Sequence, residues 1–442
     1  RGVSLPALAT ASGEMGYRMT GAFSRIRRQF GTAVGHFEGV QEASAEVAGL
    51  AYTLEAYRHL VTRGLEEGTI SVVTAMAKYH STEMMRVLIN NGMDIASGRA
   101  VQMGPRNFMA LAYQSIPVAI TVEGANILTR SLMIFGQGAM RCHPYLYDEL
   151  QAIQDEDQER GLDTFEGLFF KHAGHTLGNM SRGLVHGLSG AALAEIPANA
   201  DSFSAPWYRL ITRYSAVLAS FSDVAFALLG GDLKRREMVS ARLGDVHSQL
   251  LIACAVLKFH ATLPRDEAND AHARYALQHA FSQIHDAVED FARNFGYMGV
   301  ARILKGVFFP FGRPAGAQKP SDELIRTLGE QIMNPSSVRD ALAANAYISV
   351  DPKDSIGRVE VTYNKLLEVE RDYEAFLKAD GKGKLEGETI QAKLEDAAAK
   401  GIIPNDQVQA ILDYDEMRYD CLLTDAFDKE LKEVDMNTQR PT

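Results

Sequence analysis

The chain has 442 residues, and its 45 Lys and Arg against 56 Asp and Glu give a formal net charge of −11. This length allows two or three domains with sizeable cores, so folding requires neither disulfides nor a structural metal. The acidic balance argues against a nucleic-acid-binding protein, which needs a basic face for the phosphates. We therefore expect no nucleic acid among its partners.

The three cysteines, Cys142, Cys254 and Cys421, are far apart and form no Cys-x-x-Cys pair. This spacing predicts reduced core thiols and a reducing compartment, the cytoplasm. The most apolar stretches, such as residues 216–229 with Asp223 inside, fall short of the roughly 18 uninterrupted apolar residues of a membrane-spanning helix. We therefore expect no transmembrane helix.

Helical periodicity dominates the first part of the chain. Apolar residues between positions 40 and 65 recur at intervals of three, four and seven, which predicts one long helix. A second helix follows Gly68 and is expected to end in the turn at residues 90–92 or at Gly98. Alternation with a period of two is confined to short pieces such as residues 116–122. The sequence predicts an all-α fold.

A change in composition indicates a first domain boundary. The acidic polar run at residues 151–160 follows Pro144 and interrupts the helical pattern. We therefore place a boundary near residue 145. It separates a first helical domain, residues 1–144, from an additional helical region, residues 145–442.

A second division is expected inside the additional region. Residues 306–320 are rich in glycine and proline and predict a loop. Ser321 and the two acidic residues after it predict the start of another helix, because they satisfy its unpaired N–H groups and its dipole. Residues 361–435 are highly charged and contain a Gly-Lys-Gly-Lys sequence at 381–384, which predicts peripheral helices joined by a mobile link.

One carboxylate has an unusual local sequence. Glu123 follows the apolar residues 120–122 and precedes Gly124 and Ala125. A carboxylate with so few polar neighbours should be partly desolvated, which raises its pKa toward the range of a general base. Gly124 would let another molecule approach the backbone closely. Local sequence alone favours the simpler alternative, in which Glu123 complements a helix dipole.

Two motifs change that balance, because both occur in the order and at about the separation found in one enzyme family. They are Arg-Arg-Gln-Phe-Gly with Phe-Glu-Gly-Val-Gln at residues 27–41, and Val-Glu-Gly-Ala-Asn-Ile-Leu at residues 122–128. Residues 1–144 resemble the C-terminal helical domain of the acyl-CoA dehydrogenases. Residues 135–145 resemble in particular the large bacterial members that degrade fatty acids by β-oxidation. The resemblance implies dehydrogenation of a fatty acyl-CoA to a trans-2-enoyl-CoA, with FAD as cofactor.

The resemblance also implies roles for the residues of the second motif. Glu123 matches the catalytic base, which removes the α-proton while the β-hydrogen leaves as hydride to FAD. Gly124 matches the position that lines the thioester site. Ala125 and Asn126 match positions that face FAD.

The first motif implies further cofactor contacts. Arg27, Gln29 and Phe30 match residues that reach the pyrophosphate and adenosine end of an FAD bound mainly by the neighbouring subunit. Phe37 and Glu38 match a second flavin-facing pair. The resemblance thus implies a homodimer, and an electron-transfer carrier as a further partner.

The chain departs from the family pattern in two respects. Ser-Gly-Arg-Ala at residues 97–100 and Gln114-Ser115 stand where most members have a Gly-Gly-x-Gly turn and an Arg-Asp pair, so we assign no cofactor role there. The N-terminal helical domain and the small β-barrel domain of the family would precede Arg1. We interpret the first residue as an interior position of a longer chain.

Histidines offer a different kind of site. His172 and His175 stand three residues apart, and His186 follows. A metal site would need further ligands and acidic residues that orient the imidazoles, and Glu166 is the only obvious one nearby. We therefore favour structural histidines and predict no metal site. Hydrolase chemistry is disfavoured because the chain has no Gly-x-Ser-x-Gly elbow.

The aromatic residues Phe308, Phe309 and Phe311 stand among cations in residues 299–313. Such a segment could insert shallowly among lipid headgroups, which is our hypothesis of a peripheral contact with the inner membrane. The alternative is a buried aromatic turn in the core. Two other functions stay open: a non-catalytic helical module for oligomerisation or membrane docking, and an acyl-CoA oxidase that passes electrons to oxygen.

Overall fold

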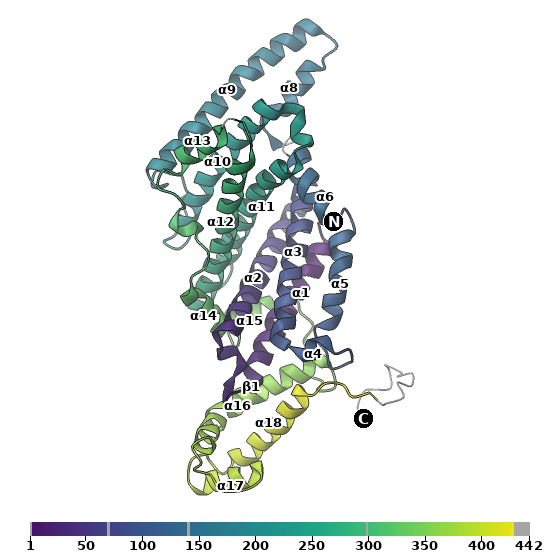
Figure 1. Cartoon of the computed structure of the whole chain (residues 1–442), viewed down its shortest axis with the longest axis vertical. Coiled ribbons are helices and arrows are strands. Elements are labelled where there is room, and N and C mark those ends of the chain that lie inside the picture. The colour runs from purple at the N-terminus through teal and green to yellow at the C-terminus, as the bar shows by residue number, and fades with distance from the viewer. Residues whose placement is uncertain (1, 69–70, 139–141, 298, 428–442) are drawn as a thin grey trace. The chain divides into compact units, whose positions relative to one another are not determined.

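The computed structural model describes residues 2–68, 71–138, 142–297 and 299–427, and these are almost entirely helical (Figure 1). The predicted all-α fold is confirmed. Contacts group the described residues into two compact units. Unit 1 holds residues 2–10, 52–84 and 117–321, and unit 2 holds residues 11–51, 85–116 and 322–427.

Four helices contribute residues to both units: α1 (Ser4–Ile26), α2 (Glu38–Glu66), α3 (Ser71–Ala96) and α5 (Ala110–Thr121). Helix α2 confirms the long helix predicted over residues 40–65. Helix α3 continues through Gly92 and ends before Gly98, the second of the two predicted stops. A Cβ at Gly92 would lie 2.3 Å from Met109 Cε, so this glycine permits close packing and does not end the helix.

Helix α5 contains most of the segment that alternates with a period of two. Residues 116–122, with their alternating pattern, belong to the end of this helix and to the turn after it, although Pro117 lies inside the helix. An isolated strand would leave its backbone N–H and C=O groups unpaired, whereas a helix satisfies most of them within the segment. The alternation therefore does not mark a strand here.

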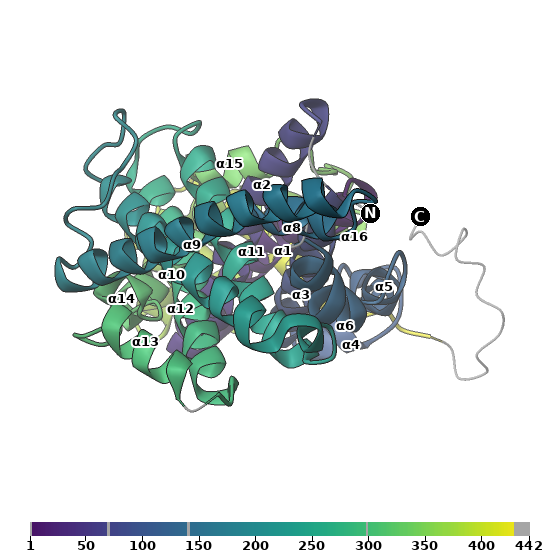
Figure 2. The ribbon, with the colours of Figure 1, turned by 90° about the horizontal axis from the view of Figure 1, so that it is seen from above.

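Unit 1 is built around four long helices and several short ones. Helices α11 and α12 run side by side, and α9 packs along α10 (Figures 1 and 2). Asp157 and Asp266 begin α9 and α12 by accepting hydrogen bonds from the backbone N–H groups of Arg160 and Asn269. The elements of this unit beyond the shared helices are α6 (Asn126–Leu128), the π-helix η2 (Thr129–Gln137), α8 (Leu146–Ile153), α9 (Gln158–Leu188), α10 (Ala205–Leu229), η3 (Gly230–Lys234), α11 (Glu237–His260), α12 (Glu267–Asn294), α13 (Val300–Phe308) and η4 (Ala315–Ala317).

Unit 2 contains the one sheet of the described residues, a hairpin of two short antiparallel strands. Its core joins α1 to the last helices of the chain through buried side chains such as Ile26, Tyr363 and Tyr414. The elements beyond the shared helices are β1 (Arg28–Gln29), β2 (Thr32–Ala33), η1 (Val34–His36), α4 (Gly98–Val101), α14 (Asp322–Gln331), α15 (Ser337–Leu342), α16 (Ser355–Asp380), α17 (Ile390–Ala399) and α18 (Gln407–Leu422).

The last helices of the chain are not peripheral, contrary to the prediction. Phe376, Leu394 and Ile411, from α16, α17 and α18, are buried in the core of unit 2. In the segment between α16 and α17 the backbone N–H of Glu386 donates to a carboxylate oxygen of Asp396 at 2.8 Å, and the mobility of this link stays a prediction. The last part of the segment that was predicted to reach residue 435 lies outside the described residues.

One described helix, Ala205–Lys234, is long and apolar enough to cross a membrane, and a second span arises if the bent pair Ala110–Thr121 and Asn126–Gly136 is counted as one. The sequence predicted no transmembrane helix because residues 216–229, with Asp223 among them, are too short to span a membrane. The helix begins earlier, at Ala205, and is therefore long enough. However, 56% of its most apolar stretch is buried inside the structure, as is usual for a core helix of a soluble protein.

The aromatic segment at residues 299–313 is largely a core element. Phe308 and Phe309 are buried, and the guanidinium of Arg213 lies 4.6 Å from the centre of the Phe309 ring. A Cβ at Gly183 of α9 would lie 2.7 Å from the Phe308 ring, so these helices approach closely. The prediction that all three phenylalanines face lipid is therefore wrong for two of them, and only Phe311 is exposed.

Candidate active site

The turn between α5 and α6 carries Glu123 in a strained conformation. Glu123 has φ of +55° and Gly124 has φ of +96°. Positive φ is common for glycine but unfavourable for other residues. Among the described residues only four non-glycine positions have it: Phe30, Ser97, Glu123 and Ala191. Two of the four are residues that the sequence motifs assign to the site, and backbone strain of this kind clusters at functional sites.

A buried lysine holds this turn. Lys78 of α3 is fully buried, and its ammonium donates to the carbonyl oxygens of Ile120 at 3.2 Å and Gly124 at 2.9 Å. It also donates to the side-chain oxygen of Asn126 at 2.5 Å. The residues before and after Glu123 are thus bonded to one charged group. Sequence analysis missed Lys78 because its burial depends on the packing of α3.

The side chain of Asn126 is used inside the chain. Its amide nitrogen donates to the hydroxyl of Thr82 at 2.9 Å and to the carboxylate of Glu83 at 2.7 Å. Because its oxygen accepts from Lys78, both ends of the buried amide are bonded. The contact with FAD that the sequence motif implies at this position would therefore have to come from the backbone.

The nine-residue π-helix η2 follows the turn. Its first residue, Thr129, donates its hydroxyl to the Gly124 carbonyl at 3.2 Å. The next residue, Arg130, pairs with Asp245 of α11 at 2.5 Å. Burial raises the pKa of the Asp245 carboxyl, and the hydrogen bond from Arg130 only partly offsets this effect. Helices with π geometry are rare and often occur at functional sites.

Glu123 itself is exposed, so the predicted partial desolvation is wrong for the described chain. The neighbouring apolar side chains do not cover it, because Val118, Ile127 and Leu128 are also exposed, with 85% of Ile127 accessible. Apolar surface of this kind beside a carboxylate is typical of a binding site. A ligand lying on these side chains would desolvate Glu123.

The residues of the first motif lie in unit 2, around the hairpin of β1 and β2. Phe30 and Gly31 form its two-residue turn, with φ of +52° and +83°. Such turns usually carry asparagine, aspartate or glycine, since both positions need positive φ. Phe30 is 96% exposed, and its ring meets that of Phe37 edge-on at 6.2 Å. An aromatic side chain in this position indicates a contact surface.

Three arginines near the hairpin differ in their partners. Arg25 pairs with Glu370 and Arg28 pairs with Glu374, each at 2.5 Å. No ion pair links Arg27 to a carboxylate within the described ranges. The arginine of the sequence motif therefore keeps its charge available for an anion.

The structure groups the predicted site residues in two places. Glu123, Gly124, Ala125 and Asn126 adjoin in unit 1, whereas Arg27, Gln29, Phe30, Phe37 and Glu38 adjoin in unit 2. Glu38 begins α2 and pairs with Arg326 at 3.2 Å. The 135–145 segment that carries part of the resemblance includes residues 139–141, which lie outside the described residues.

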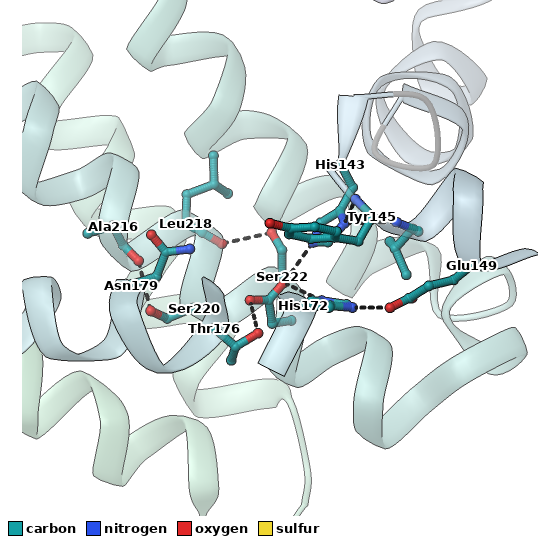
Figure 3. A network of polar contacts seen from close by, with 12 residues as sticks. His143, Tyr145, Glu149, His172, Thr176, Asn179, Ala216, Leu218, Ser220 and Ser222 are labelled. Carbon is teal, nitrogen blue, oxygen red and sulfur yellow. Dashed lines mark hydrogen bonds and ion pairs between the residues drawn. The ribbon is translucent and has the colours of Figure 1, made fainter. Parts of the chain in front are cut away.

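A second polar cluster in unit 1 connects α8, α9 and α10 (Figure 3). Nε2 of His143 donates to Asp223 at 3.0 Å, and the Thr176 hydroxyl donates to the other oxygen of that carboxylate at 2.6 Å. His172 lies between two carboxylates, with Nδ1 2.9 Å from Glu149 and Nε2 3.6 Å from Asp223. Sequence analysis identified His172 but not its partners, which are remote in the chain.

This cluster meets the spatial requirement for a metal site, since one ligand atom each from His143, His172 and Asp223 lie within 4.8 Å of one another. The hydrogen bonds favour another interpretation. Nδ1 of His143 accepts from the backbone N–H groups of Tyr145 and Leu146, so the ring proton is on Nε2. That nitrogen faces Asp223 as a donor, and the cluster is best described as a hydrogen-bond network.

A cavity of about 400 Å³ adjoins the network. Phe135, Leu218, Phe226 and Leu250 line it, and so does the edge of His143. Burial lowers the pKa values of the two further histidines in its wall, His175 and His247, and so favours their neutral forms. Its walls are predominantly apolar.

Comparison with known families gives two matches, one after the other along the chain. Residues 4–134 match the acyl-CoA dehydrogenase C-terminal domain, and residues 140–427 match the acyl-CoA dehydrogenase C-terminal region of bacterial type. The chain belongs to the acyl-CoA dehydrogenase family.

Individual relatives are distant. The probable acyl-CoA dehydrogenase FadE10 of Mycobacterium bovis is 23% identical over 295 residues, which cover 64% of this chain and 43% of that protein. FadE10 of Mycobacterium tuberculosis matches to the same extent. The chain thus spans less than half the length of these relatives. An acyl-CoA dehydrogenase of Bacillus anthracis, solved in complex with FAD, shares the fold with a TM-score of 0.55 and 13% identity, over 74% of this chain and 55% of that one.

Proposed function

We propose that this chain belongs to an FAD-dependent enzyme that dehydrogenates fatty acyl-CoA to trans-2-enoyl-CoA, with Glu123 as the base. The observation that carries the proposal is the exposed carboxylate at a strained turn, held from both sides by the buried Lys78. Backbone strain persists only where the surrounding structure enforces it. If Glu123 only complemented a helix dipole, neither the backbone strain nor the hydrogen bonds from Lys78 to the turn would be needed.

In the proposed reaction Glu123 accepts a proton from the α-carbon of the thioester. The α-proton becomes acidic enough when the thioester oxygen is hydrogen-bonded, because the developing negative charge is then stabilised. An acyl chain lying on Val118 and Ile127 would exclude water from the carboxylate and make it a stronger base. FAD, when bound, accepts the β-hydrogen as hydride.

The residues near the hairpin fit a dinucleotide cofactor. Arg27 has a guanidinium that no described carboxylate neutralises, and guanidinium groups pair well with phosphates. Phe30 offers an exposed aromatic face nearby. We propose that Arg27, Gln29 and Phe30 contact the FAD of a second subunit in a homodimer, and that Phe37 and Glu38 lie beside it. An electron-transfer carrier would then reoxidise the flavin in the cytoplasm.

The test replaces Glu123 with glutamine in the FAD-loaded enzyme that contains this chain. Glutamine keeps the shape of the side chain but cannot accept the proton, so formation of enoyl-CoA should fall about 100- to 10,000-fold. Flavin content and thermal stability should not change. Glu67→Gln, at an exposed position near the end of α2, is the matched control and should leave turnover unaltered. Turnover by Glu123→Gln close to that of the parent would place the base elsewhere.

A further inference from the structure

We propose that Lys78 is the positioning residue for the base: its ammonium fixes the Glu123 turn in the conformation that presents the carboxylate. This inference rests on the proposed function of Glu123. Lys78 lies 45 positions before Glu123 in the sequence, and neither motif includes it. Its role follows from the hydrogen bonds around the turn.

The hydrogen bonds define the charge of Lys78. Its nitrogen faces three oxygen acceptors, from Ile120, Gly124 and Asn126. Oxygen acceptors need N–H donors, and a neutral amine has only two, whereas an ammonium has three. Lys78 is therefore a buried cation, and a charge at such a position requires strong local compensation.

The compensation comes from the turn and from one carboxylate. Ile120 is in the last turn of α5, where carbonyl groups lack helical partners and carry the negative end of the helix dipole. The Asn126 amide accepts from Lys78 and donates to Glu83, so it connects the buried cation to an anion. Lys78 and Glu83 both lie on α3, so the groups that hold the turn are fixed on one helix.

The geometry makes the conformation of Glu123 depend on Lys78. The bonded carbonyls belong to Ile120, three residues before Glu123, and to Gly124, the residue after it. A rotation that relaxed the positive φ of Glu123 would move the Gly124 carbonyl away from the ammonium. The hydrogen bonds from Lys78 therefore offset the backbone strain at Glu123. Their loss should lower turnover, because misplacing a catalytic group by about 1 Å can lower turnover about 100-fold.

The first test is Lys78→Met in the FAD-loaded enzyme, with Lys258→Met, at an exposed position of α11, as the matched control. Methionine retains the length and apolar stem but donates no hydrogen bond. We expect kcat to fall about 10- to 100-fold while KM changes much less, because substrate binding does not depend on the turn conformation alone. Hydrogen–deuterium exchange at residues 121–129 should accelerate at least tenfold in Lys78→Met and remain unchanged in the control.

A double variant separates positioning from general stability. If Lys78 acts through Glu123, adding Lys78→Met to Glu123→Gln should lower the residual turnover no further. Independent losses that multiply would overturn the positioning role. Unchanged kcat and unchanged exchange in Lys78→Met would also overturn it. A failure of Glu123→Gln to lower turnover would refute the proposed base. The hydrogen–deuterium exchange data would still show whether Lys78 holds the turn.

Thr129→Val provides the test if Lys78→Met does not fold. It removes the second donor to the Gly124 carbonyl and leaves the buried charge in place. Faster exchange at residues 121–129, with a two- to tenfold lower kcat, is the expected result. If hydrogen–deuterium exchange and turnover in this variant equal those of the parent, the claim that hydrogen bonds to its carbonyl groups hold the turn is contradicted.

Discussion

Glu123 and Phe30 adopt backbone angles that most side chains avoid, and each lies in a motif that the sequence assigns to the site. Each is also exposed, so packing against the described chain does not explain the strain. Lys78 explains it at Glu123 through hydrogen bonds to the turn. At Phe30 the two-residue hairpin requires positive φ and accepts a phenylalanine in place of the usual glycine or asparagine.

Arg27 gives a prediction at this scale. Arg27→Ala should weaken FAD binding about 10- to 100-fold, because a hydrogen bond to a charged group contributes about 1.5–3 kcal/mol. It should also increase dissociation of the dimer, measured by sedimentation alongside flavin content. Arg27→Lys should restore only part of the affinity, since an ammonium cannot make a planar two-point contact.

The control for Arg27 is an arginine outside the hairpin. Arg371→Ala removes an exposed guanidinium of α16 that is already paired with Asp372, so it should leave FAD binding unaffected. Equal loss of flavin in both variants would show that general positive charge, and not Arg27 in particular, holds the cofactor.

Sequence reasoning proposed roles for Glu123 and Arg27 but not for Lys78, and the reason is physical. The first two stand in short contiguous motifs whose spacing is visible in one dimension. Lys78 is recognisable only once α3 and the turn after α5 are packed together. Its neighbours Met76 and Ala77 are buried, which places it on a core-facing stretch, but a lysine there would ordinarily be taken to reach solvent.

At the scale of elements, the network of His143, His172 and Asp223 joins three helices of unit 1. Asp223 lies inside the most apolar helix of the chain, and its carboxylate accepts bonds from His143 and Thr176. The sequence analysis favoured structural histidines, and His172 lies between the carboxylates of Glu149 and Asp223. The sequence could not identify Glu149 or Asp223 as partners because they belong to other helices.

Asp223→Ala tests this network. It leaves the donors of His143 and Thr176 without their acceptor, so the free energy of unfolding should fall by about 1–3 kcal/mol. Burial raises the pKa of the Asp223 carboxyl, but the hydrogen bonds and the nearby imidazoles outweigh it and lower the pKa below its ordinary value. A lowered folded-state pKa stabilises the protein above the unfolded value of about 3.9, and this contribution is lost as the pH falls through the folded value.

The difference in unfolding free energy between parent and Asp223→Ala should therefore persist from pH 7 to about pH 4 and shrink below it. Chemical denaturation at several pH values measures it. Asp163→Ala, at an exposed position of α9, is the control and should have little effect. A difference that already shrinks between pH 7 and 5 would contradict the assignment to Asp223.

At the scale of the whole molecule, the helical fold was predictable because periodic apolar residues identify long helices directly. The arrangement into units was not. Helices α1, α2, α3 and α5 each contribute to both units, so a boundary drawn along the sequence at residue 144 does not separate them. The segment 306–320, predicted as a loop, begins inside α13 and contains η4. It ends just before residue 321, where the chain passes from unit 1 to unit 2.

The central claim is that Glu123 removes the α-proton of a fatty acyl-CoA. The most direct measurement is exchange of the α-hydrogen with D₂O in the FAD-loaded enzyme, using an acyl-CoA whose β-carbon is replaced by sulfur. Such a compound has no β-hydrogen to lose as hydride, so the measurement reports the base alone. The parent enzyme should incorporate deuterium at the α-carbon, and Glu123→Gln should do so at least about 100-fold more slowly. Exchange by Glu123→Gln at the parental rate would contradict the account.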